Sequence, residues 1–498
     1  MKRLTISLVL ISAIIASALG HAATIRVNTA GDLFGDNPVC SLREAIIAAN
    51  QDADFQGCVA SDLPYGTDRI VFASGLAGQA HVMTRAGAGE AAAETGDLDI
   101  TDDLHIVGDP AGTVIDGNQT DRVFDIGTAG ITVTFDRLQI VGGNPPPTDF
   151  LEAQGGGIRM NVDATLVLND TIVTLNEISG GIETLLGGGV QSSGTLILHR
   201  SEVTRNTLSG TSPLIGAGIS SVAGDLQVFD SRVSDNLATH SAGSFARGGG
   251  IAAENGGSVS LVRSEVALNR VYSADGNVQG GGLRASGETS VTITNSTFSG
   301  NEVQTDAGSG SVATGAGLFI NVNGVAELNI NSSTIVQNTT TADNGASTFF
   351  AGLTASAAAI RLANTIIAGN LAGGSASDCN GGFDFTSLGY NIVEDNCGIS
   401  AASGDVFGAD PALGPLGDHG GANPLTANPW THIPQPGSPA IDAGNPGPPT
   451  GLPACPPLDQ RGFVRPDSNG QQRCDIGAHE VGSPGLDSLF SDSFEQVP

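Results

Sequence analysis

Short runs of alternating apolar and polar residues recur along the middle of the chain. Examples lie at residues 166–168, 196–198, 259–261 and 328–330. A period of two residues is typical of β-strands, whereas an amphipathic helix needs apolar residues three and four positions apart over ten or more residues. We therefore predict β-strands in these runs and do not expect arrays of helical repeats.

A glycine-rich triplet precedes these runs, and the two together form a repeat. The triplets begin at residues 155, 187, 216, 248, 280 and 315, so they return at intervals of roughly 30 residues. Self-similarity of this kind indicates a solenoid, in which each coil buries its apolar side chains against its neighbours. We predict an all-β fold, a parallel β-helix over residues 61–377.

An asparagine closes each copy of the repeat, at Asn144, Asn176, Asn206, Asn236, Asn269, Asn301, Asn338 and Asn370. Asparagine tolerates the left-handed backbone conformation that a tight corner requires. In coils stacked about 4.8 Å apart, these side chains would lie over one another and form a hydrogen-bonded turn ladder. A ligand-binding track is the functional alternative, but the stacking that every solenoid needs favours the ladder.

The segments between each asparagine and the next glycine triplet vary in length. Residues 207–215, 237–247, 271–279 and 303–314 are rich in Ser, Gly, Thr and Ala. We expect loops here, all on one side of the stack. Insertions that share one face of a solenoid often form its binding face.

Residues 1–23 have the pattern of a secretory signal peptide. Lys2 and Arg3 precede an apolar run from Leu4 to Leu19, and small residues follow it. No later stretch approaches the roughly eighteen continuous apolar residues of a membrane-spanning helix, so we predict no integral membrane span. We therefore expect an exported protein, either extracellular or on the outer cell surface.

Residues 24–60 combine a short strand with an amphipathic helix. Ser41 and Glu44 have the spacing of a helix capping box, and the apolar residues that follow share one helical face: Leu42, Ala45, Ile46 and Ala49. The first coil of a solenoid must be covered, because an open strand edge recruits other chains. We predict that this helix is the N-terminal lid.

The segment from Cys40 to Asn50 resembles the signature of bacterial CSLREA-domain proteins. That resemblance covers eleven residues and implies an exported bacterial protein in which the segment precedes a right-handed parallel β-helix. It implies an architecture and no particular activity.

Residues 378–482 form a proline-rich, irregular region. Its ordered set of short motifs begins with Asp418-His419-Gly420-Gly421 and ends with Cys474-Asp475-Ile476-Gly477-Ala478-His479-Glu480. The set resembles the choice-of-anchor Q domain of bacterial β-helix proteins, with His419 where the pattern has Asn. The resemblance implies surface attachment through a secretion or anchoring partner. Residues 483–498 form an acidic tail. Within it, Leu489 to Glu495 is similar to a short Phe-x-Asp-Gly-Phe-Glu tail of exported proteins, with Ser493 in the place of glycine, and a frayed acidic terminus is the favoured alternative.

The six cysteines stand as three local pairs: Cys40 and Cys58, Cys379 and Cys397, Cys455 and Cys474. An even number in an exported chain indicates disulfides, although six cysteines allow fifteen pairings. Zinc binding is disfavoured, because no two cysteines stand two to four residues apart.

Composition and charge disfavour several classes of fold and partner. The chain holds 71 glycines and only 4% aromatic residues, which suits a solenoid better than a globular core. The formal net charge of -31 argues against nucleic acid and anionic lipid as partners. Lys2 is the only lysine, so the mature chain cannot contain the Arg-Ile-Lys element of polygalacturonase-like sites.

Few residues are candidates for acid/base catalysis or metal binding. Asp102 and Asp103 are adjacent, so on a strand they would point to opposite faces and make a poor acid/base pair. For the three histidines of the C-terminal region, His419, His432 and His479, we expect structural hydrogen bonding rather than a metal site.

Arg159 and Arg284 each follow the aliphatic residue of a repeat, so they should point outward and are the weak candidates for binding acidic sugars. Their equivalents in other coils form no continuous basic groove: Gln191, Ser220, Ala252 and Phe319. No cofactor is expected. Weak Ca²⁺ binding by acidic loops is the secondary alternative, although the EF-hand and Gly-Gly-x-Gly-x-Asp patterns are absent.

The favoured hypothesis is a non-catalytic exported β-helix protein that uses its loop face for adhesion or carbohydrate binding. Its partner would be an extracellular glycan or the surface of a host or neighbouring cell. The alternative is a polysaccharide lyase or glycoside hydrolase. A cleft with two or three carboxylates, or carboxylates and an arginine, within about 5 to 9 Å would favour the enzyme.

Overall fold

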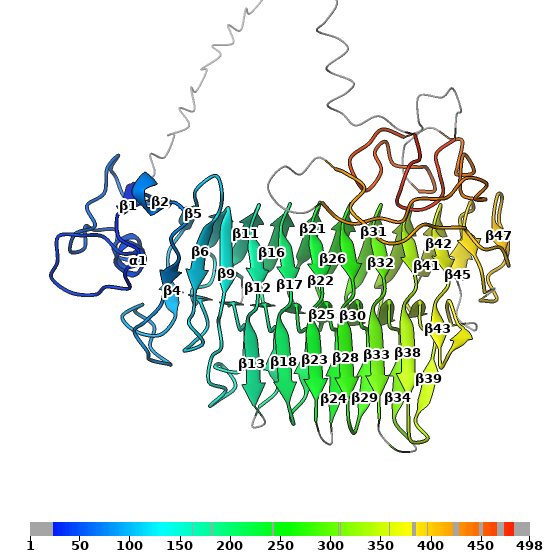
Figure 1. Cartoon of the computed structure of the whole chain (residues 1–498), viewed down its shortest axis with the longest axis horizontal. Helices are drawn as coiled ribbons and strands as arrows, with labels where there is room; N and C mark the ends of the chain where they lie inside the picture. Colours follow the sequence, from blue (N-terminus) through cyan, green and yellow to red (C-terminus); the bar gives the residue numbers. More distant parts are fainter. Residues whose placement is uncertain are drawn as a thin grey trace, which may run out of the picture.

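The chain folds into a parallel β-solenoid whose strands stack along one long axis (Figure 1). The computed structural model describes residues 23–482, except residues 162, 181–182, 242–243, 307, 309, 358, 381–384, 396, 422–427, 448–451 and 466–472. Nearly every pair of neighbouring strands is parallel and joins one coil to the next. The predicted fold class is therefore confirmed. Residues 1–22 of the predicted signal peptide and the whole acidic tail lie outside the described residues.

Three sheets form the body of the solenoid. Sheet 1 has twelve strands, from β1 (Thr24–Val27) to β45 (Phe385–Ser387), and sheet 3 has twelve, from β3 (His81–Val82) to β47 (Val406–Phe407). Sheet 2 has nine strands, from β4 (Leu98–Ile100) to β40 (Leu353–Ser356). Strands thus continue beyond residue 377, where the sequence predicted the end of the β-helix.

One coil shows the order in which the chain visits the sheets. The coil runs through β11 (Thr165–Asn169) in sheet 1, β12 (Ile172–Thr174) in sheet 3, β13 (Glu177–Gly180) in sheet 4, β14 (Leu185–Leu186) in sheet 5 and β15 (Val190–Ser192) in sheet 2. Its inward side chains are fully buried, among them Leu166, Leu168 and Val173. Each fully buried aliphatic side chain contributes roughly 1.5 to 3 kcal/mol, so the body is stable as a stack of coils.

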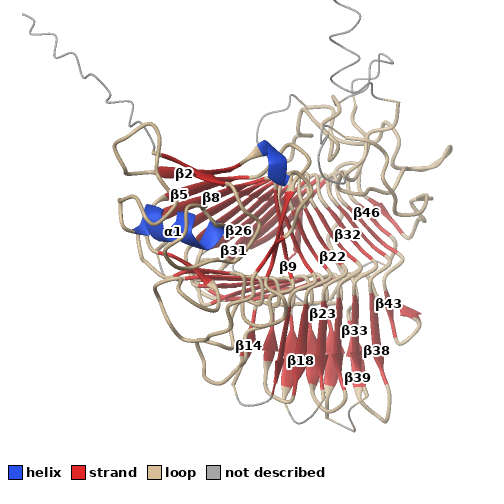
Figure 2. Ribbon diagram, turned by 60° about the vertical axis from the view of Figure 1, so that its left-hand side comes forward, coloured by secondary structure: helices blue, strands red, loops and turns tan. Residues whose placement is uncertain are grey.

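Sheets 4 and 5 correct the prediction of loops. The segments expected to be loops each hold two strands, such as β18 (Thr207–Gly210) and β19 (Leu214–Ile215), and their repeats form sheets of eight and six strands. Their apolar side chains make a second core, which includes Leu208, Leu214 and Val278. The two sheets project from the body (Figure 2). One or two apolar residues per strand are too few to identify a strand by pattern, but stacking over successive coils buries them together.

The glycine triplets lie where sheet 5 turns into sheet 2. The first glycine of each triplet adopts a left-handed conformation, with φ of 66° at Gly187 and 71° at Gly216. A Cβ atom at Gly187 would collide with the carbonyl group of Val190. The turn therefore requires glycine for both its φ angle and its lack of a side chain.

The closing asparagines from Asn176 to Asn370 form one hydrogen-bonded column. In each step the backbone N–H and the side-chain Nδ2 of one asparagine donate to Oδ1 of the next, at 3.0 and 3.0 Å between Asn206 and Asn236. Asn370 ends the column on Asp378 Oδ1 at 2.8 Å. These side chains are almost fully buried, which leaves no accessible ligand track along them.

Two details of the column differ from the expectation. Asn144 lies outside it, because Gly143 occupies the position in register and donates its N–H to Asn176 Oδ1 at 2.9 Å. The left-handed residue of each corner is the one before the asparagine, for example Leu175 with φ of 56° and Arg205 with φ of 54°. Asparagine is thus required here for its paired donor and acceptor rather than for its backbone conformation.

The N-terminal helix α1 (Leu42–Asn50) packs on the first coils and lies at the end of the solenoid (Figure 2). Its capping box is formed as the sequence predicted, with Ser41 accepting from the N–H of Glu44 and Glu44 accepting from the N–H of Ser41. Arg43 is buried and donates to the carbonyl oxygens of Ala93, Gly96 and Asp97. The helix therefore both covers the first coil and fixes residues 93–97.

The C-terminal region packs along the side of the solenoid, over sheet 3 (Figure 1, orange). Ser299 Oγ lies 2.8 Å from His432 Nε2, and Thr297 Oγ1 donates to Gln460 Oε1 at 2.6 Å. His479 Nδ1 lies 2.9 Å from Thr431 Oγ1. The hydrogen bonds of His432 and His479 are of the structural kind that the sequence predicted. The prediction is wrong for His419, whose Nε2 is buried without a hydrogen bond among the described residues and whose ring packs edge-on against that of His479. Burial lowers the pKa of His479 to about 2.

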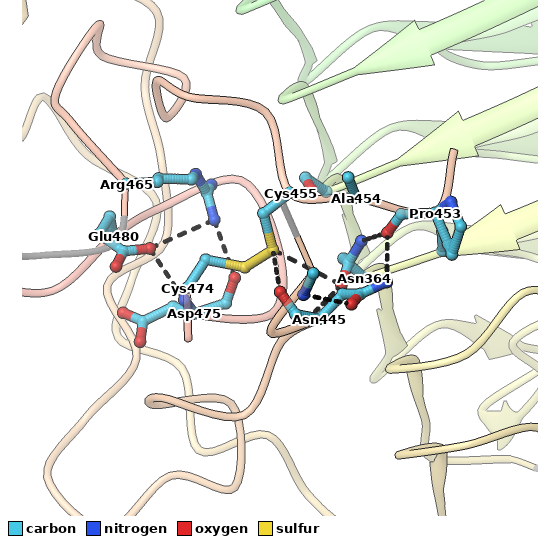
Figure 3. Close-up of a disulfide and its surroundings, with 12 residues drawn as sticks. Asn364, Asn445, Pro453, Ala454, Cys455, Arg465, Cys474, Asp475 and Glu480 are labelled. Carbon is cyan, nitrogen blue, oxygen red and sulfur yellow. Dashed lines mark hydrogen bonds and ion pairs between the residues drawn. A yellow bond between two sulfur atoms is a disulfide. The ribbon is translucent and has the colours of Figure 1, made fainter. Parts of the chain in front are cut away.

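Three disulfides join the cysteines as local pairs: Cys40 with Cys58, Cys379 with Cys397, and Cys455 with Cys474. The third lies where the C-terminal region meets a corner of the solenoid (Figure 3). There Asn364 Nδ2 donates to the carbonyl of Pro453 at 2.7 Å, and Asn364 Oδ1 accepts from the N–H of Asn445 at 2.9 Å. Disulfides of this kind persist in oxidising compartments, which fits an exported protein.

Candidate functional site

Arg159 and Arg284 both lie on the face of sheet 2 that points away from the core, but Arg284 is only 6% exposed and so does not reach the surface as the sequence predicted. Arg159 is the middle residue of β10 (Ile158–Met160), whose flanking side chains point into the core. The strand register places it beside Asp125 of β7 (Phe124–Ile126) on one side and Gln191 on the other. The alternation of the strand thus aims Arg159 outward, in a column that begins with Asp99 and Asp125.

Both arginines are paired with carboxylates. Arg159 donates from Nε and Nη2 to the two oxygens of Asp125, at 3.1 and 2.5 Å. Arg284 donates to Glu254, and its side chain is only 8% exposed. Burial lowers the pKa of Arg284 to about 10.

The structure does not bring the two arginines together. Between them in the column lie Gln191, Ser220 and Ala252, which are at most 2% exposed. Arg159 and Arg284 are therefore two separate positions and not one basic surface.

A pocket of about 120 Å³ opens beside Arg159. Its lining comes from β10 and β15, from the residue that follows each of them, and from the segment before β10: Leu151, Gln154, Arg159, Met160, Asn161, Gln191 and Ser193. The polar members are side-chain amides, a hydroxyl and one guanidinium, all of which can bond to hydroxyl groups. Leu151, which is exposed, adds apolar surface. The pocket is thus suited to a small polar ligand that also has an apolar face.

A cluster of carboxylates is joined to the pocket through the ion pair of Asp125 with Arg159. Asp97, Asp99 and Asp125 each offer an oxygen within 4.8 Å of the others, and they are 5, 4 and 6% exposed. Arg122 is buried among them and donates to Asp97 at 2.6 Å and to Glu152 at 2.5 Å. We call Asp97, Asp99, Asp121, Asp125, Glu152 and Arg122 the acidic cluster.

Arg122 also connects the acidic cluster to the pocket. Its Nη1 donates to the carbonyl oxygens of Gln154 at 2.6 Å and Leu151 at 3.4 Å, and both of these residues line the pocket. The backbone around the pocket is therefore held by the same guanidinium that neutralises the carboxylates.

Burial shifts the acidic cluster toward its protonated forms. It raises the pKa of Asp97 well above its usual range, that of Asp99 to about 7 and that of Asp121 to about 6. Repulsion from neighbouring carboxylates adds to the shift at Asp97 and Asp99, whereas Arg122 opposes it. Near neutral pH the cluster therefore carries less negative charge than its composition suggests.

The oxygen atoms of Asp97, Asp99 and Asp125 are of the type that Ca²⁺ prefers. A cation there would compete with Arg122 for Asp97 and with Arg159 for Asp125. Acid/base chemistry on a polysaccharide would require a carboxyl group that reaches the sugar. Asp99 Oδ2 instead accepts the N–H of Ala93, and the side chain is covered. The arrangement thus suits a structural charge cluster better than an acid/base pair.

The sequence did not identify the acidic cluster. Its visible signal is the repetition of apolar-Asp-apolar in Leu98-Asp99-Ile100 and Phe124-Asp125-Ile126, two strands that the structure places side by side in register. Asp102 and Asp103, the pair examined as an acid/base candidate, lie outside these strands, where Asp103 Oδ1 accepts the N–H of Thr132. The carboxylates of the acidic cluster are therefore brought together by the register of successive coils and not by being adjacent in the sequence.

Comparison with protein-family models and with curated proteins finds no match to this chain. Among the residues that the structure describes, no helix has the length and apolar character needed to cross a membrane. The disulfide-bonded parallel β-solenoid is an architecture consistent with a surface or polysaccharide-related protein.

Proposed function

We propose that this protein is an exported, non-catalytic β-helix protein that binds an extracellular glycan in the pocket beside Arg159. The observation that carries the proposal is the lining of this pocket, in which Gln154, Asn161, Gln191 and Ser193 surround the ion-paired Arg159. Sugars present hydroxyl groups that both donate and accept hydrogen bonds, and amide side chains offer both functions.

The position of the pocket also favours binding. Its polar residues come from neighbouring coils whose backbones are hydrogen-bonded to one another, so their spacing is fixed before a ligand arrives. Preorganisation of this kind reduces the entropic cost of binding. The binding face we propose is thus the outer face of sheet 2 and not the loop face expected from the sequence, since that segment forms sheets 4 and 5.

Export and surface attachment are part of the proposal. They rest on the signal-peptide pattern of residues 1–23, on the three disulfides and on the resemblance to the CSLREA and choice-of-anchor Q families. In this proposal an anchoring or secretion partner holds the C-terminal region, and the solenoid presents the pocket to glycans of the surroundings or of a neighbouring cell.

A glycan-retention assay tests the proposal. The protein is incubated with a panel of neutral and uronate-containing glycans, and both retention and the release of reducing or unsaturated ends are measured. We expect retention without release. Ser193→Phe, which fills the pocket, should abolish retention, whereas Ser356→Phe on the last strand of the same sheet should leave it unchanged. Retention that survives Ser193→Phe would place binding elsewhere.

A polysaccharide lyase or glycoside hydrolase is the second candidate function. The observation that favours it is the gathering of Asp97, Asp99 and Asp125 around an arginine next to a pocket. The burial of these carboxylates opposes it. Release of reducing or unsaturated ends by the wild type, lost in Asp99→Asn, would establish the enzyme and reject the binding protein.

A further inference from the structure

The way in which Arg159 is held bears on the kind of glycan that the pocket accepts. Its guanidinium stands on the pocket wall, and its side chain is 18% exposed. An isolated arginine in this position would attract the carboxylate of an acidic sugar, since arginine binds carboxylates through two parallel hydrogen bonds. Here Nε and Nη2 already donate to both oxygens of Asp125, so that one of the two double-donor edges of the guanidinium is occupied and its positive charge is paired.

From this geometry we infer that the pocket selects neutral sugars and rejects uronates, and that Asp125 is the residue that determines this specificity. The inference rests on the proposed function and names its ligand class. Asp125 occupies one of the two edges on which Arg159 could hold a sugar carboxylate, and its negative charge offsets that of the guanidinium.

The surroundings of the ion pair reinforce this selection. The other polar side chains of the pocket are uncharged: Gln154, Asn161, Gln191 and Ser193. Behind Asp125 lie Asp97 and Asp99, within 4.8 Å of it, and Arg122 is itself engaged with Asp97 and Glu152. No positive charge of the acidic cluster is therefore left to pair with a uronate, and the chain as a whole carries a formal net charge of -31.

The test compares oligogalacturonate with a neutral gluco-oligosaccharide of equal length on wild type and Asp125→Asn. We expect the wild type to retain more of the neutral oligosaccharide than of oligogalacturonate. Asp125→Asn keeps the shape of the side chain but removes its charge, so retention of oligogalacturonate should rise about tenfold at low salt and fall again as salt is added. Arg159→Gln combined with Asp125→Asn should cancel the gain.

Several controls keep the outcomes separate. The melting temperature of each variant shows whether it is folded, and the single variant Arg159→Gln must not gain oligogalacturonate binding. Preferential retention of oligogalacturonate by the wild type would overturn this inference while leaving glycan binding intact. An unchanged preference in a folded Asp125→Asn variant would overturn it as well. Retention of neither glycan would overturn the proposed function, and this inference with it.

Discussion

Asn206 accepts two hydrogen bonds from Asn176 on its side-chain Oδ1, one from the backbone N–H at 3.1 Å and one from Nδ2 at 3.0 Å. Its own Nδ2 donates to Asn236 Oδ1 and to the carbonyl of Val173. Asn206→Ala leaves several of these buried groups without partners, each at a cost of about 1 to 3 kcal/mol, so we expect the free energy of unfolding to fall by roughly 3 kcal/mol. Urea unfolding measures this loss.

Asn144→Ala is the matched control for the asparagine column. The side chain of Asn144 makes one long hydrogen bond of 3.3 Å, to Gln119, in an exposed setting. We expect this change to cost less than about 0.5 kcal/mol. Equal losses in the two variants would contradict the role assigned to the column.

Arg122 should be essential for the stability of the first coils. It is 1% exposed and holds two carboxylates and two carbonyl groups. Arg122→Met leaves buried carboxylates without their counter-charge, so we expect a loss of about 3 to 5 kcal/mol in unfolding free energy. Arg270→Met is the control, because the Arg270 side chain is 58% exposed and its pair with Glu302 should contribute less than about 1 kcal/mol. A smaller loss at Arg122 than at Arg270 would refute the prediction.

Asp99 should make the protein less stable as pH rises. Its pKa is raised to about 7, whereas an aspartate in the unfolded chain has a pKa of about 3.9. Between these values the folded chain holds a proton that the unfolded chain has released, so this contribution to stability is lost as pH increases from about 4 to about 7.

The comparison with Asp99→Asn isolates this contribution. Buried His479, whose pKa is lowered, acts in the opposite sense below its unfolded pKa of about 6.5, so the slope of the wild type alone is not decisive. Urea unfolding at pH 5 and pH 8 should show a smaller fall in stability for the variant than for the wild type. An equal fall in both proteins would show that Asp99 is not the titrating group.

Removal of divalent cations should have little effect. Asp97 and Asp125 are paired with Arg122 and Arg159, and the raised pKa of Asp99, about 7, leaves that carboxyl about half protonated near neutral pH. We expect EDTA to change the melting temperature by less than about 2 °C. A fall of several degrees that is reversed by Ca²⁺, and is absent in Asp99→Asn, would instead identify a cation site in the acidic cluster.

The repeat determined most of the architecture from the sequence alone. Glycine triplets, alternating strands and closing asparagines are local features, and each has a local cause: a left-handed turn, a period of two residues and a side chain with both donor and acceptor. Stacking coils that share this pattern then places Asn176, Asn206 and Asn236 over one another. The capping box of Ser41 and Glu44 is equally local, and it was predictable for the same reason.

The candidate site was only partly predictable. The alternation of residues 158–160 was enough to turn Arg159 outward, but the partners of Arg159 come from other coils. Asp125 precedes it by a full coil, and Asp97 and Asp99 by two. Coil length varies, so the sequence does not fix which carboxylate stands beside which arginine, and the register of the strands decides it.

The sequence by itself determined that this chain is a parallel β-helix with a helical lid, glycine corners and an asparagine column, because those features arise within one repeat. Only the tertiary structure decided that the Ser- and Gly-rich segments form two further sheets, that the C-terminal region lies along sheet 3, and that Asp125 neutralises Arg159. These three results depend on contacts between residues far apart in the chain. In all three cases, the stacking of the coils decides which side chains are buried and which charges are paired, and no local sequence pattern does.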